Sequence, residues 1–600
     1  MIRLSDYVID FVAKQGVKHI FMVAGGGAMF LVDSLGKRKD IGYICNHHEQ
    51  ASAMSAEGYQ RVTANLGAGL VSTGPAGTNT VTGVLCSWND SIPILFISGQ
   101  ANSRCLIGNT GLRQLGTHEA DIIKIVGSVT KYAVTVTDEK TIRYHLEKAV
   151  FLARSGRPGP VWVDIPIDMQ GKIIDENSLA SFSPEREKIE ARPVLDSSKV
   201  SAVAEILQKA ERPIIIAGHG IRLSSAQQRF IDFIEKYHIP VVTTKNGFDL
   251  LYESHKLLAG RIGTYGQRAG NFAVQNSDLV LAMGTRLPFT VVGYQTQWFA
   301  REAKKIVVDI DPVQLEHSTI KIDISVNADL RDFIPELDRA LNGKPLRTEP
   351  WIERCARWRV KYPSVLPEWK AQKEYVNPYY FFEVLSEELG DDDIVVTDQG
   401  AAFYCSTAAF KLKQGQRLFT NGGFSPMGYG LPAAIGACLG SDRKKVICVH
   451  GDGGLQLNIQ ELQTIVHYKL PIKLFIFNNQ GYLSIKNMQL QYFDGFLVGA
   501  DPKSGVSCPD TLRIADAYHI PSRKIENHIH IRKQIKEAIN SEGPTIVDII
   551  LHPLQPFMPR VISERKPDGK LISKPLEDMW PFLAREEFLR EMIVKPVEEN

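Results

Sequence analysis

Short apolar runs alternate with helical patterns along the first 170 or so residues. Helical patterns such as 50–62 separate the apolar runs, which lie at 19–23, 42–45, 67–72, 92–98 and 160–165. A strand that is buried on both faces shows a nearly continuous apolar run, and strands that alternate with helices form parallel sheets covered on both sides. This pattern predicts an α/β domain built on a doubly wound parallel sheet.

The same alternation returns twice further along the chain. Apolar runs of the second region lie at 212–218, 240–242, 279–284 and 305–310, and those of the third lie at 393–397, 445–450, 472–478 and 544–550. The chain is therefore predicted to be an α/β protein with three doubly wound parallel-sheet domains, which a length of 600 residues accommodates.

Polar stretches mark the boundaries of these regions. Residues 172–197 form a polar linker, and 344–376 form a second linker that we expect to be packed because it carries three tryptophans. The expected domains are 1–172, 197–343 and 377–560, followed by a C-terminal tail at 561–600 with a short charged helix at 585–592.

Composition and charge exclude several classes of protein. The chain has 69 basic and 67 acidic residues, a net charge of +2, and gives no reason to expect binding to nucleic acid. No apolar run approaches the roughly 20 residues needed to cross a membrane. None of the eight cysteines forms a CxxC pair, so we expect buried free thiols in a reducing cytoplasm.

An acidic residue between glycines follows the apolar run at 446–449. Asp452 stands in a Gly-Asp-Gly-Gly sequence with Gly453 and Gly454, and the next predicted strand ends in Asn478 and Asn479. Ligands bind at the carboxyl ends of parallel strands, so Asp452 and Asn479 are expected to face each other there. Their oxygens suit Mg²⁺ bound together with a phosphate, which the glycine N–H groups would approach. The alternative is a tight strand–helix turn with an aspartate cap.

A glutamate opens a helix of small residues near the N-terminus. The apolar run at 43–45 leads to Glu49, after which the pattern turns helical. A carboxyl group in an apolar place keeps its proton available, whereas a helix N-terminus favours the ionised form, so two roles remain open. Glu49 is either a proton-transfer group or a helix-start acid paired with the helix dipole.

These segments together resemble a known family. The sequence Gly451-Asp452-Gly453, followed after 24 residues by Asn478-Asn479, is similar to the thiamine-diphosphate (ThDP) fingerprint of the acetolactate synthase and pyruvate decarboxylase superfamily. His48-Glu49-Gln50-Ala51, the loop at 72–79 and the strand end at 97–100 also resemble acetolactate-synthase-like segments in order and spacing. The resemblance covers nearly the whole chain, as pyrimidine-binding, middle and diphosphate-binding domains.

The resemblance implies specific roles for residues of this chain. The Mg²⁺ ligands would be Asp452, Asn479 and the backbone oxygen of Gly481, and Glu49 would protonate the aminopyrimidine ring of ThDP. Met427 would support the bent cofactor, and the backbone of Gly26 would lie beside the reacting carbon. Further cofactor-binding residues would be Pro75, Asn79, Gly400, Ser425, Gly453, Gly454 and Tyr482.

Three departures from acetolactate synthase bear on the substrate. His118 stands where the family has a glutamine, and it is either a donor or proton shuttle in the pocket or a surface residue. Gln114 is a second polar candidate. Met488 lies near the place where true synthases carry a tryptophan that shapes the acceptor site. In this respect the segment of this chain is more similar to a side branch of the family, which is linked to branched sugars and long α-hydroxyketones.

The middle region resembles the flavin-carrying domain of acetolactate synthase. The likeness rests on 240–244, 263–266, 284–286 and 309–312, but residues 287–293 replace the acidic flavin segment. The fold is therefore expected, and flavin adenine dinucleotide (FAD) is a candidate ligand with a structural role.

The resemblance implies a ThDP- and Mg²⁺-dependent carboligase. It would decarboxylate a 2-oxo acid, of which pyruvate is the simplest, and transfer the acyl fragment to a carbonyl acceptor. The alternatives are acetolactate synthase proper, a 2-oxo acid decarboxylase or flavin-linked oxidase, and an inactive scaffold paralogue. Because the family pairs the pyrimidine site of one subunit with the diphosphate site of another, a homodimer is the minimal unit and a homotetramer is common.

Overall fold

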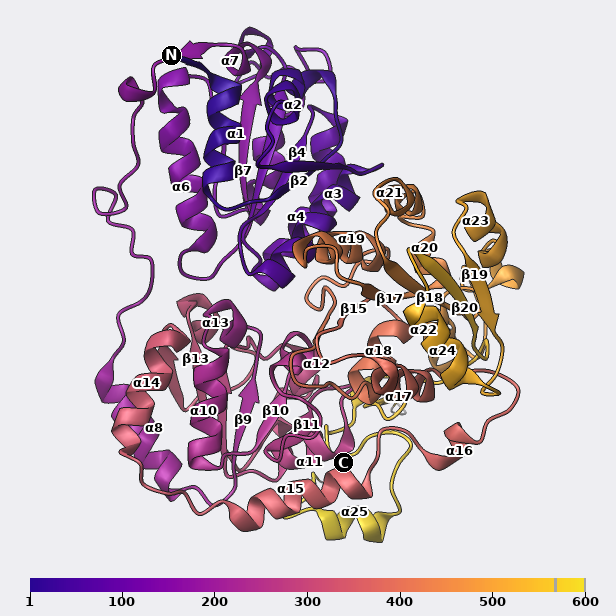
Figure 1. Ribbon diagram of the computed structural model, residues 1–600. Coiled ribbons are helices and arrows are strands. Elements are labelled where there is room, and N and C mark those ends of the chain that lie inside the picture. Colours follow the sequence, from indigo (N-terminus) through magenta and orange to yellow (C-terminus); the bar gives the residue numbers. More distant parts are fainter. Residues whose placement is uncertain (566–568, 598–600) are drawn as a thin grey trace.

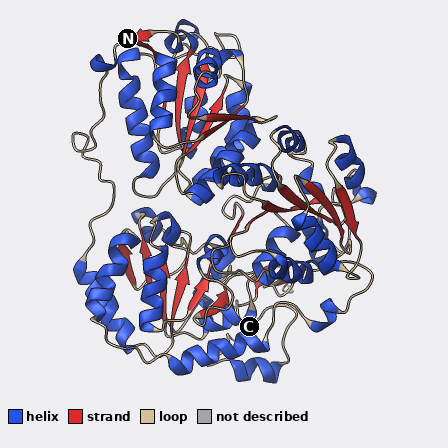
Figure 2. Cartoon of the chain, in the orientation of Figure 1, coloured by secondary structure: helices blue, strands red, loops and turns tan. Residues whose placement is uncertain are grey.

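Three six-stranded sheets, each flanked by helices on both faces, make up the protein in a computed structural model that describes residues 1–565 and 569–597 (Figures 1 and 2). All strand pairs within these sheets are parallel. The predicted fold class is therefore confirmed.

The first sheet has the order β3-β2-β4-β5-β7-β6. Its strands are β2 (His19–Met22), β3 (Gly42–Cys45), β4 (Gly67–Val71), β5 (Ile94–Gln100), β6 (Ala133–Thr135) and β7 (Val161–Pro166). The helices that cover it are α1 (Leu4–Lys14), α2 (Met29–Gly36), α3 (Glu49–Thr63), α4 (Pro75–Asp90), α5 (Ile122–Val126), α6 (Ile142–Arg154) and α7 (Ile167–Gln170).

The middle sheet has the order β11-β10-β9-β12-β13-β14. Its strands are β9 (Pro213–Ala217), β10 (Val241–Thr243), β11 (Leu258–Arg261), β12 (Leu279–Met283), β13 (Lys304–Asp309) and β14 (Ile324–Asn327). The helices around it are α8 (Ser197–Lys209), α9 (Gly220–Leu223), α10 (Gln227–Tyr237), α11 (Arg268–Gln275), α12 (Phe289–Val292), α13 (Pro312–Glu316) and α14 (Leu330–Leu341).

The third sheet, β16-β15-β17-β18-β20-β19, repeats the strand order of the first. Its strands are β15 (Ile394–Thr397), β16 (Arg417–Phe419), β17 (Val446–Gly451), β18 (Ile472–Asn478), β19 (Ser522–Ile525) and β20 (Thr545–Ile550). Its helices are α17 (Pro378–Glu388), α18 (Ala401–Ala409), α19 (Gly430–Gly440), α20 (Asp452–Leu455), α21 (Glu461–His467), α22 (Leu483–Tyr492), α23 (Thr511–Ala517) and α24 (Ile531–Asn540).

The second linker differs from its prediction in one respect. It is packed, as expected, but it forms helices α15 (Glu349–Lys361) and α16 (Pro367–Lys370). Trp351, Cys355 and Trp358 are buried and lie four and three residues apart, which is the spacing of one helix face. The tail adds the hairpin β21 (Ser563–Arg565) and β22 (Leu571–Ser573) and the helix α25 (Arg585–Glu591).

The first and third domains meet through α3 and α19 (Figure 1). A Cβ placed on Gly58 would lie 2.1 Å from the carbonyl oxygen of Ala433, and one on Gly436 would lie 1.8 Å from that of Ser55. Only glycine allows the two helix backbones to approach so closely.

The lengths of the helices and the state of the cysteines bear on two expectations from the sequence. Among the described residues, no helix is long and apolar enough to cross a membrane. The eight cysteines are free thiols, and five of them are buried, which agrees with the expectation of buried thiols.

Candidate active site

The two loops predicted to meet around a metal ion lie against each other. Asp452 opens α20 directly after β17, and Asn479 follows β18. The Oδ2 atom of Asp452 accepts hydrogen bonds from the backbone N–H of Asn479 at 3.2 Å and from that of Gly481 at 3.1 Å. Adjacent parallel strands therefore bring together residues that lie 27 and 29 positions apart.

The oxygens of this turn are buried and incompletely satisfied. The side-chain Oδ1 of Asn479 is buried without a hydrogen-bond partner. Burial raises the pKa of Asp452 to about 6, and hydrogen bonds from the backbone N–H groups of Gly481 and Gly453 oppose that rise. A buried carboxylate beside an amide oxygen without a donor is the chemistry that a hard cation takes up.

Glycine is required at two positions of the turn. Gly481 has φ +125°, and a Cβ there would lie 2.4 Å from the carbonyl oxygen of Ala500. A Cβ on Gly453 would lie 2.4 Å from a ring carbon of Tyr482. The ring of Tyr482 therefore packs directly over Gly453, and both were predicted to bind the cofactor. Gly454 is buried in the same short helix.

Glu49 and Asn79, both predicted cofactor residues, contact each other at the edge of the first sheet. Glu49 is the first residue of α3, and Asn79 lies in the first turns of α4, which begins at Pro75. Asn79 Nδ2 donates a hydrogen bond to Glu49 Oε2 at 3.0 Å. The preceding His48 caps α3 by accepting from the N–H of Gln50. The half-buried Glu49 is thus held in place by Asn79 while it remains partly accessible.

The glycine turn that contains Gly26 lies over the loop before α4. The N–H of Gly27 donates to Ser72 Oγ at 3.1 Å, whereas a Cβ on Gly26 would meet no atom within 4 Å. His118 has φ +58° and an exposed side chain. Its carbonyl oxygen lies so close to Gly74 that a Cβ on Gly74 would be 2.1 Å from it. His118 therefore borders this loop through its backbone.

Gln114 belongs to the exposed loop that leads to His118. Its Nε2 donates to the carbonyl oxygen of Glu119 at 3.1 Å. The Glu119 carboxylate in turn accepts hydrogen bonds from the N–H groups of Leu115 and Gly116. In this chain Gln114 is engaged in holding its own loop.

The support segment, which contains Ser425 and Met427, lies in the third domain just before α19. Ser425 has φ +60°, and its N–H donates to Asn421 Oδ1 at 3.2 Å. Met427 is 39% exposed, so its side chain is presented outward from the segment. Gly400, with φ +71°, lies at the start of α18, and a Cβ on it would lie 3.6 Å from Ser484 Oγ.

The candidate residues therefore form two half-sites. The first-domain half holds Gly26, Glu49, Pro75, Asn79, Gln114 and His118, and the third-domain half holds Gly400, Ser425, Met427, Asp452, Gly453, Gly454, Asn479, Gly481 and Tyr482. Within residues 1–565 and 569–597, no hydrogen bond or ion pair joins Glu49 to the third domain. Large apolar side chains that are exposed at or near the candidate residues of both halves in the sequence are Met29, Leu112, Leu115, Phe424, Met427 and Ile485.

Comparison with known domain families decides the assignment. Residues 2–123 match the thiamine pyrophosphate enzyme N-terminal TPP binding domain, 200–337 match the central domain, and 398–549 match the C-terminal TPP binding domain. TPP is another name for ThDP. The acetolactate synthase large subunit of Cyanidium caldarium is 31% identical over 91% of this chain and 92% of its own length.

The chain belongs to the thiamine pyrophosphate enzyme family. Similar relatives include the probable acetolactate synthase large subunit of Methanocaldococcus jannaschii, at 31% identity over 92% of this chain and 93% of its own length. The acetolactate synthase large subunit of Lactococcus lactis is 30% identical over 93% of this chain and 94% of its own length. The chain is therefore an acetolactate-synthase-like, ThDP-dependent enzyme, and the predicted resemblance is confirmed.

Two residues of this thiamine pyrophosphate enzyme that the sequence had not singled out lie beneath the third-domain half-site. The carboxylate of Asp398, at the end of β15, accepts hydrogen bonds from the N–H groups of Gly428 and Gly430. Asp398 Oδ2 also lies 3.3 Å from Nδ1 of the fully buried His450. Each residue follows or ends an apolar strand, which is the only sequence signal that could have indicated them.

A buried lysine fixes the asparagine loop. Lys486 of α22 donates from Nζ to the carbonyl oxygen of Asn479 at 2.9 Å and to that of Gln480 at 3.3 Å. Burial lowers the pKa of Lys486, and Asp452 opposes that effect. The lysine therefore sets the orientation of backbone carbonyls next to Gly481.

A separate cavity of about 160 Å³ lies where the three domains meet. It is lined by Arg157 from the first domain, by His219 and Arg286 from the middle domain, and by Gly422 from the third. Burial lowers the pKa of His219 to about 3. Pro288, Thr290 and Val291, from the segment 287–293 that differs from the acidic flavin segment of acetolactate synthase, also line this cavity.

Proposed function

We propose that this enzyme is a ThDP- and Mg²⁺-dependent carboligase that decarboxylates a 2-oxo acid, with pyruvate as the simplest candidate, and transfers the acyl fragment to a carbonyl acceptor. The observation that carries the proposal is the turn in which buried Asp452 and the unpartnered Oδ1 of Asn479 lie side by side. A turn of this kind, in a member of this family, suits a cation that bridges protein oxygens to a diphosphate.

The residues of the turn fit Mg²⁺. Asp452, Asn479 and the carbonyl of Gly481 would supply a carboxylate, an amide and a backbone oxygen, which are hard ligands. Among the described residues, no cluster of three His, Cys, Asp or Glu side chains offers an alternative metal site. The N–H groups at the start of α20 would face the diphosphate, since a helix N-terminus favours an anion.

The first-domain half would manage a proton. When bound, ThDP supplies the nucleophilic carbon that attacks the 2-oxo acid and accepts the electron pair released as carbon dioxide leaves. Glu49 would hold and return a proton at the aminopyrimidine ring, and Asn79, which donates to its Oε2, would fix the orientation of the carboxyl group. The backbone at Gly26 would leave room for the reacting atoms, because a Cβ placed on Gly26 would have no atom within 4 Å.

The acceptor distinguishes the competing functions. The names of the relatives favour acetolactate synthase proper, in which a second 2-oxo acid would be the acceptor. Against this, Met488, which is 49% exposed, stands near the place of the synthase tryptophan, so an acceptor pocket formed there would differ from that of the synthase. A plain decarboxylase would have no acceptor, and an inactive scaffold is disfavoured because Glu49, Asp452 and Asn479 are retained.

We propose that a homodimer is the smallest active unit, and a homotetramer is compatible with it. Apolar side chains are exposed at or next to the candidate residues of each half-site, such as Leu115 beside Gln114, and Met427. Burying such surfaces against a second copy would stabilise the assembly and bring a complete set of cofactor residues together.

FAD is the ligand to test at the cavity between the three domains. Arg157 and Arg286 would suit its phosphates, and a flavin held there would have a structural role, since none of the described residues that line the cavity is a half-site candidate. The absorption spectrum of the purified protein and a titration with FAD decide this point.

The function is tested with purified protein, ThDP, Mg²⁺ and pyruvate. Carbon dioxide release is measured with a panel of acceptors that includes 2-oxo acids, keto-sugars and long aldehydes. The products are then identified by mass. An α-hydroxyketone supports the carboligase, and free aldehyde alone indicates a decarboxylase. No carbon dioxide with any 2-oxo acid would contradict the proposal.

A further inference from the structure

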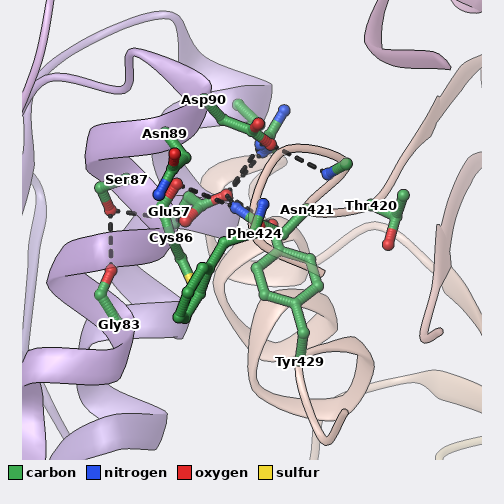
Figure 3. Close-up of polar contacts among 12 residues, drawn as sticks. Glu57, Gly83, Cys86, Ser87, Asn89, Asp90, Thr420, Asn421, Phe424 and Tyr429 are labelled. Carbon is green, nitrogen blue, oxygen red and sulfur yellow. Dashed lines mark hydrogen bonds and ion pairs between the residues drawn. The ribbon is translucent and has the colours of Figure 1, made fainter. Parts of the chain in front are cut away.

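Acidic side chains of the first domain reach across the domain boundary to the loop that precedes α19. Glu57 lies in the middle of α3 and Asp90 at the end of α4, and both point toward the segment 420–429 of the third domain (Figure 3). Glu57 and its partner Asn421 are completely buried. Asn421 lies 364 residues from Glu57 in the sequence, so only the packing of the domains brings them together.

Asn421 uses both ends of its amide group. Its Nδ2 donates to Glu57 Oε1 at 3.1 Å and to the carbonyl oxygen of Cys86 at 3.0 Å, and both acceptors belong to the first domain. Its Oδ1 accepts from the N–H of Phe424 at 3.1 Å and from that of Ser425 at 3.2 Å. One buried amide therefore ties two helices of the first domain to the backbone of the support segment.

The support segment needs such a tie. Ser425 has φ +60°, a left-handed conformation that costs energy for a residue with a side chain and persists only when its surroundings impose it. Met427 follows two residues later and is presented outward. The hydrogen bond from the N–H of Ser425 to Asn421 fixes the backbone immediately before Met427.

The buried carboxylate of Glu57, which lies on the first-domain side of Asn421, is paired with an arginine and accepts further hydrogen bonds. Arg61 Nη2 lies 2.8 Å from Glu57 Oε1 and 2.5 Å from Asp90 Oδ2. Tyr429 donates its hydroxyl to Glu57, and the N–H of Gly422 donates to Asp90. A buried carboxylate is retained only when it is paired and hydrogen-bonded in this way.

We propose that Glu57 and Asn421 are positioning residues that hold the Ser425–Met427 segment in the conformation that supports the pyrimidine part of ThDP. This inference rests on the proposed function, since it names ThDP as the ligand of that segment. Glu57 acts on this segment through Asn421 and through Tyr429, because Glu57 is buried behind the loop and touches neither Ser425 nor Met427 with a hydrogen bond.

Two ligands separate positioning from general stability. ThDP needs both the support segment and the Asp452 turn, whereas inorganic diphosphate with Mg²⁺ needs only the turn. Calorimetry on the full-length protein with each ligand is therefore carried out for wild type, Asn421→Ala and Glu57→Leu, with Ser87→Ala as the matched control. Ser87 Oγ contacts Glu57 Oε2 at 3.4 Å but has no bond to the loop.

The expected result is a roughly tenfold or greater loss of ThDP affinity in Asn421→Ala and Glu57→Leu, with the affinity for Mg²⁺–diphosphate and all values for Ser87→Ala unchanged. Unchanged ThDP affinity in Asn421→Ala, or an equal loss for both ligands, overturns the inference. Asn421→Ser provides the same comparison should the alanine variant not fold. A wild-type protein that binds no ThDP contradicts the proposed function itself.

Discussion

Glu49 and Asp452 show how two carboxyl groups acquire different tasks from their surroundings. Asp452 is buried and held by backbone N–H groups, and burial raises its pKa to about 6. Glu49 is half-buried at the start of α3 and is held by one side-chain amide. The first surroundings suit a fixed metal ligand, and the second suit a group that exchanges a proton with a bound molecule.

The first prediction concerns Glu49→Gln. We expect ThDP affinity to be kept, because an amide oxygen still accepts from Asn79, whereas turnover falls by roughly 100- to 10,000-fold because an amide cannot transfer the proton. Calorimetry measures the affinity, and carbon dioxide release measures the turnover. Glu185→Gln, at an exposed site in the linker that follows the first domain, is the control. Turnover equal to that of wild type would remove Glu49 from the mechanism.

At the scale of elements, the interior strands were predicted and most edge strands were not. The strands β9 and β12 are buried over their whole length and appear as continuous apolar runs. The edge strands β6, β14 and β19 are short and only partly buried, so their sequences carry no such run. The pairing of the Asp452 and Asn479 loops was predictable because each follows an interior strand.

The ends of β5, β6 and β7 share one buried carboxylate. Asp164 accepts hydrogen bonds from Ser98 Oγ at 2.5 Å, Gln100 Nε2 at 3.1 Å and Thr135 Oγ1 at 3.0 Å. Burial nevertheless raises the pKa of Asp164 to about 7. Gln100 also accepts from Thr73, so this carboxylate lies behind the loop that leads to α4.

The second prediction follows from the pKa of Asp164. Its folded-state pKa lies above the unfolded value of roughly 4, so the folded protein binds the extra proton between about pH 4 and 7. Protonated Asp164 therefore stabilises the fold at low pH, and its contribution to the free energy of unfolding falls by roughly 4 kcal/mol as the pH rises through that window. In Asp164→Asn this part of the pH dependence should disappear. Urea unfolding of both proteins at pH 5 and 7.5 measures it, and identical pH slopes would refute the assignment.

At the scale of the whole molecule, the arrangement of the domains carries what the sequence could not indicate. The contact of Glu57 with Asn421 depends on how α3 packs on α19, and neither residue stands in a motif. The cavity beside Arg286 and Gly422 likewise exists only because three domains converge. Local periodicity predicts each sheet, but it contains no information on how separate sheets pack.

The third prediction tests whether two subunits share each active site. Glu49→Gln and Asp452→Ala are each expected to be inactive alone. Dissociated and reassembled as an equal mixture, they should recover about a quarter of wild-type activity, because half of the dimers are mixed and each of these has one intact site. Activity assays combined with sedimentation measure this recovery. No recovery in mixtures that contain mixed dimers would show that each chain builds its site alone.

Binding of ThDP to Asp452 and Asn479 through Mg²⁺ is measured by calorimetric titration of ThDP in the presence of Mg²⁺ or of a chelator. Wild type and the exposed-site control Asp442→Ala are expected to bind ThDP only when Mg²⁺ is present, and Asp452→Ala is expected not to bind it under either condition. Undiminished affinity in Asp452→Ala, or wild-type binding that persists in the chelator, would show that Asp452 and Mg²⁺ do not hold the cofactor.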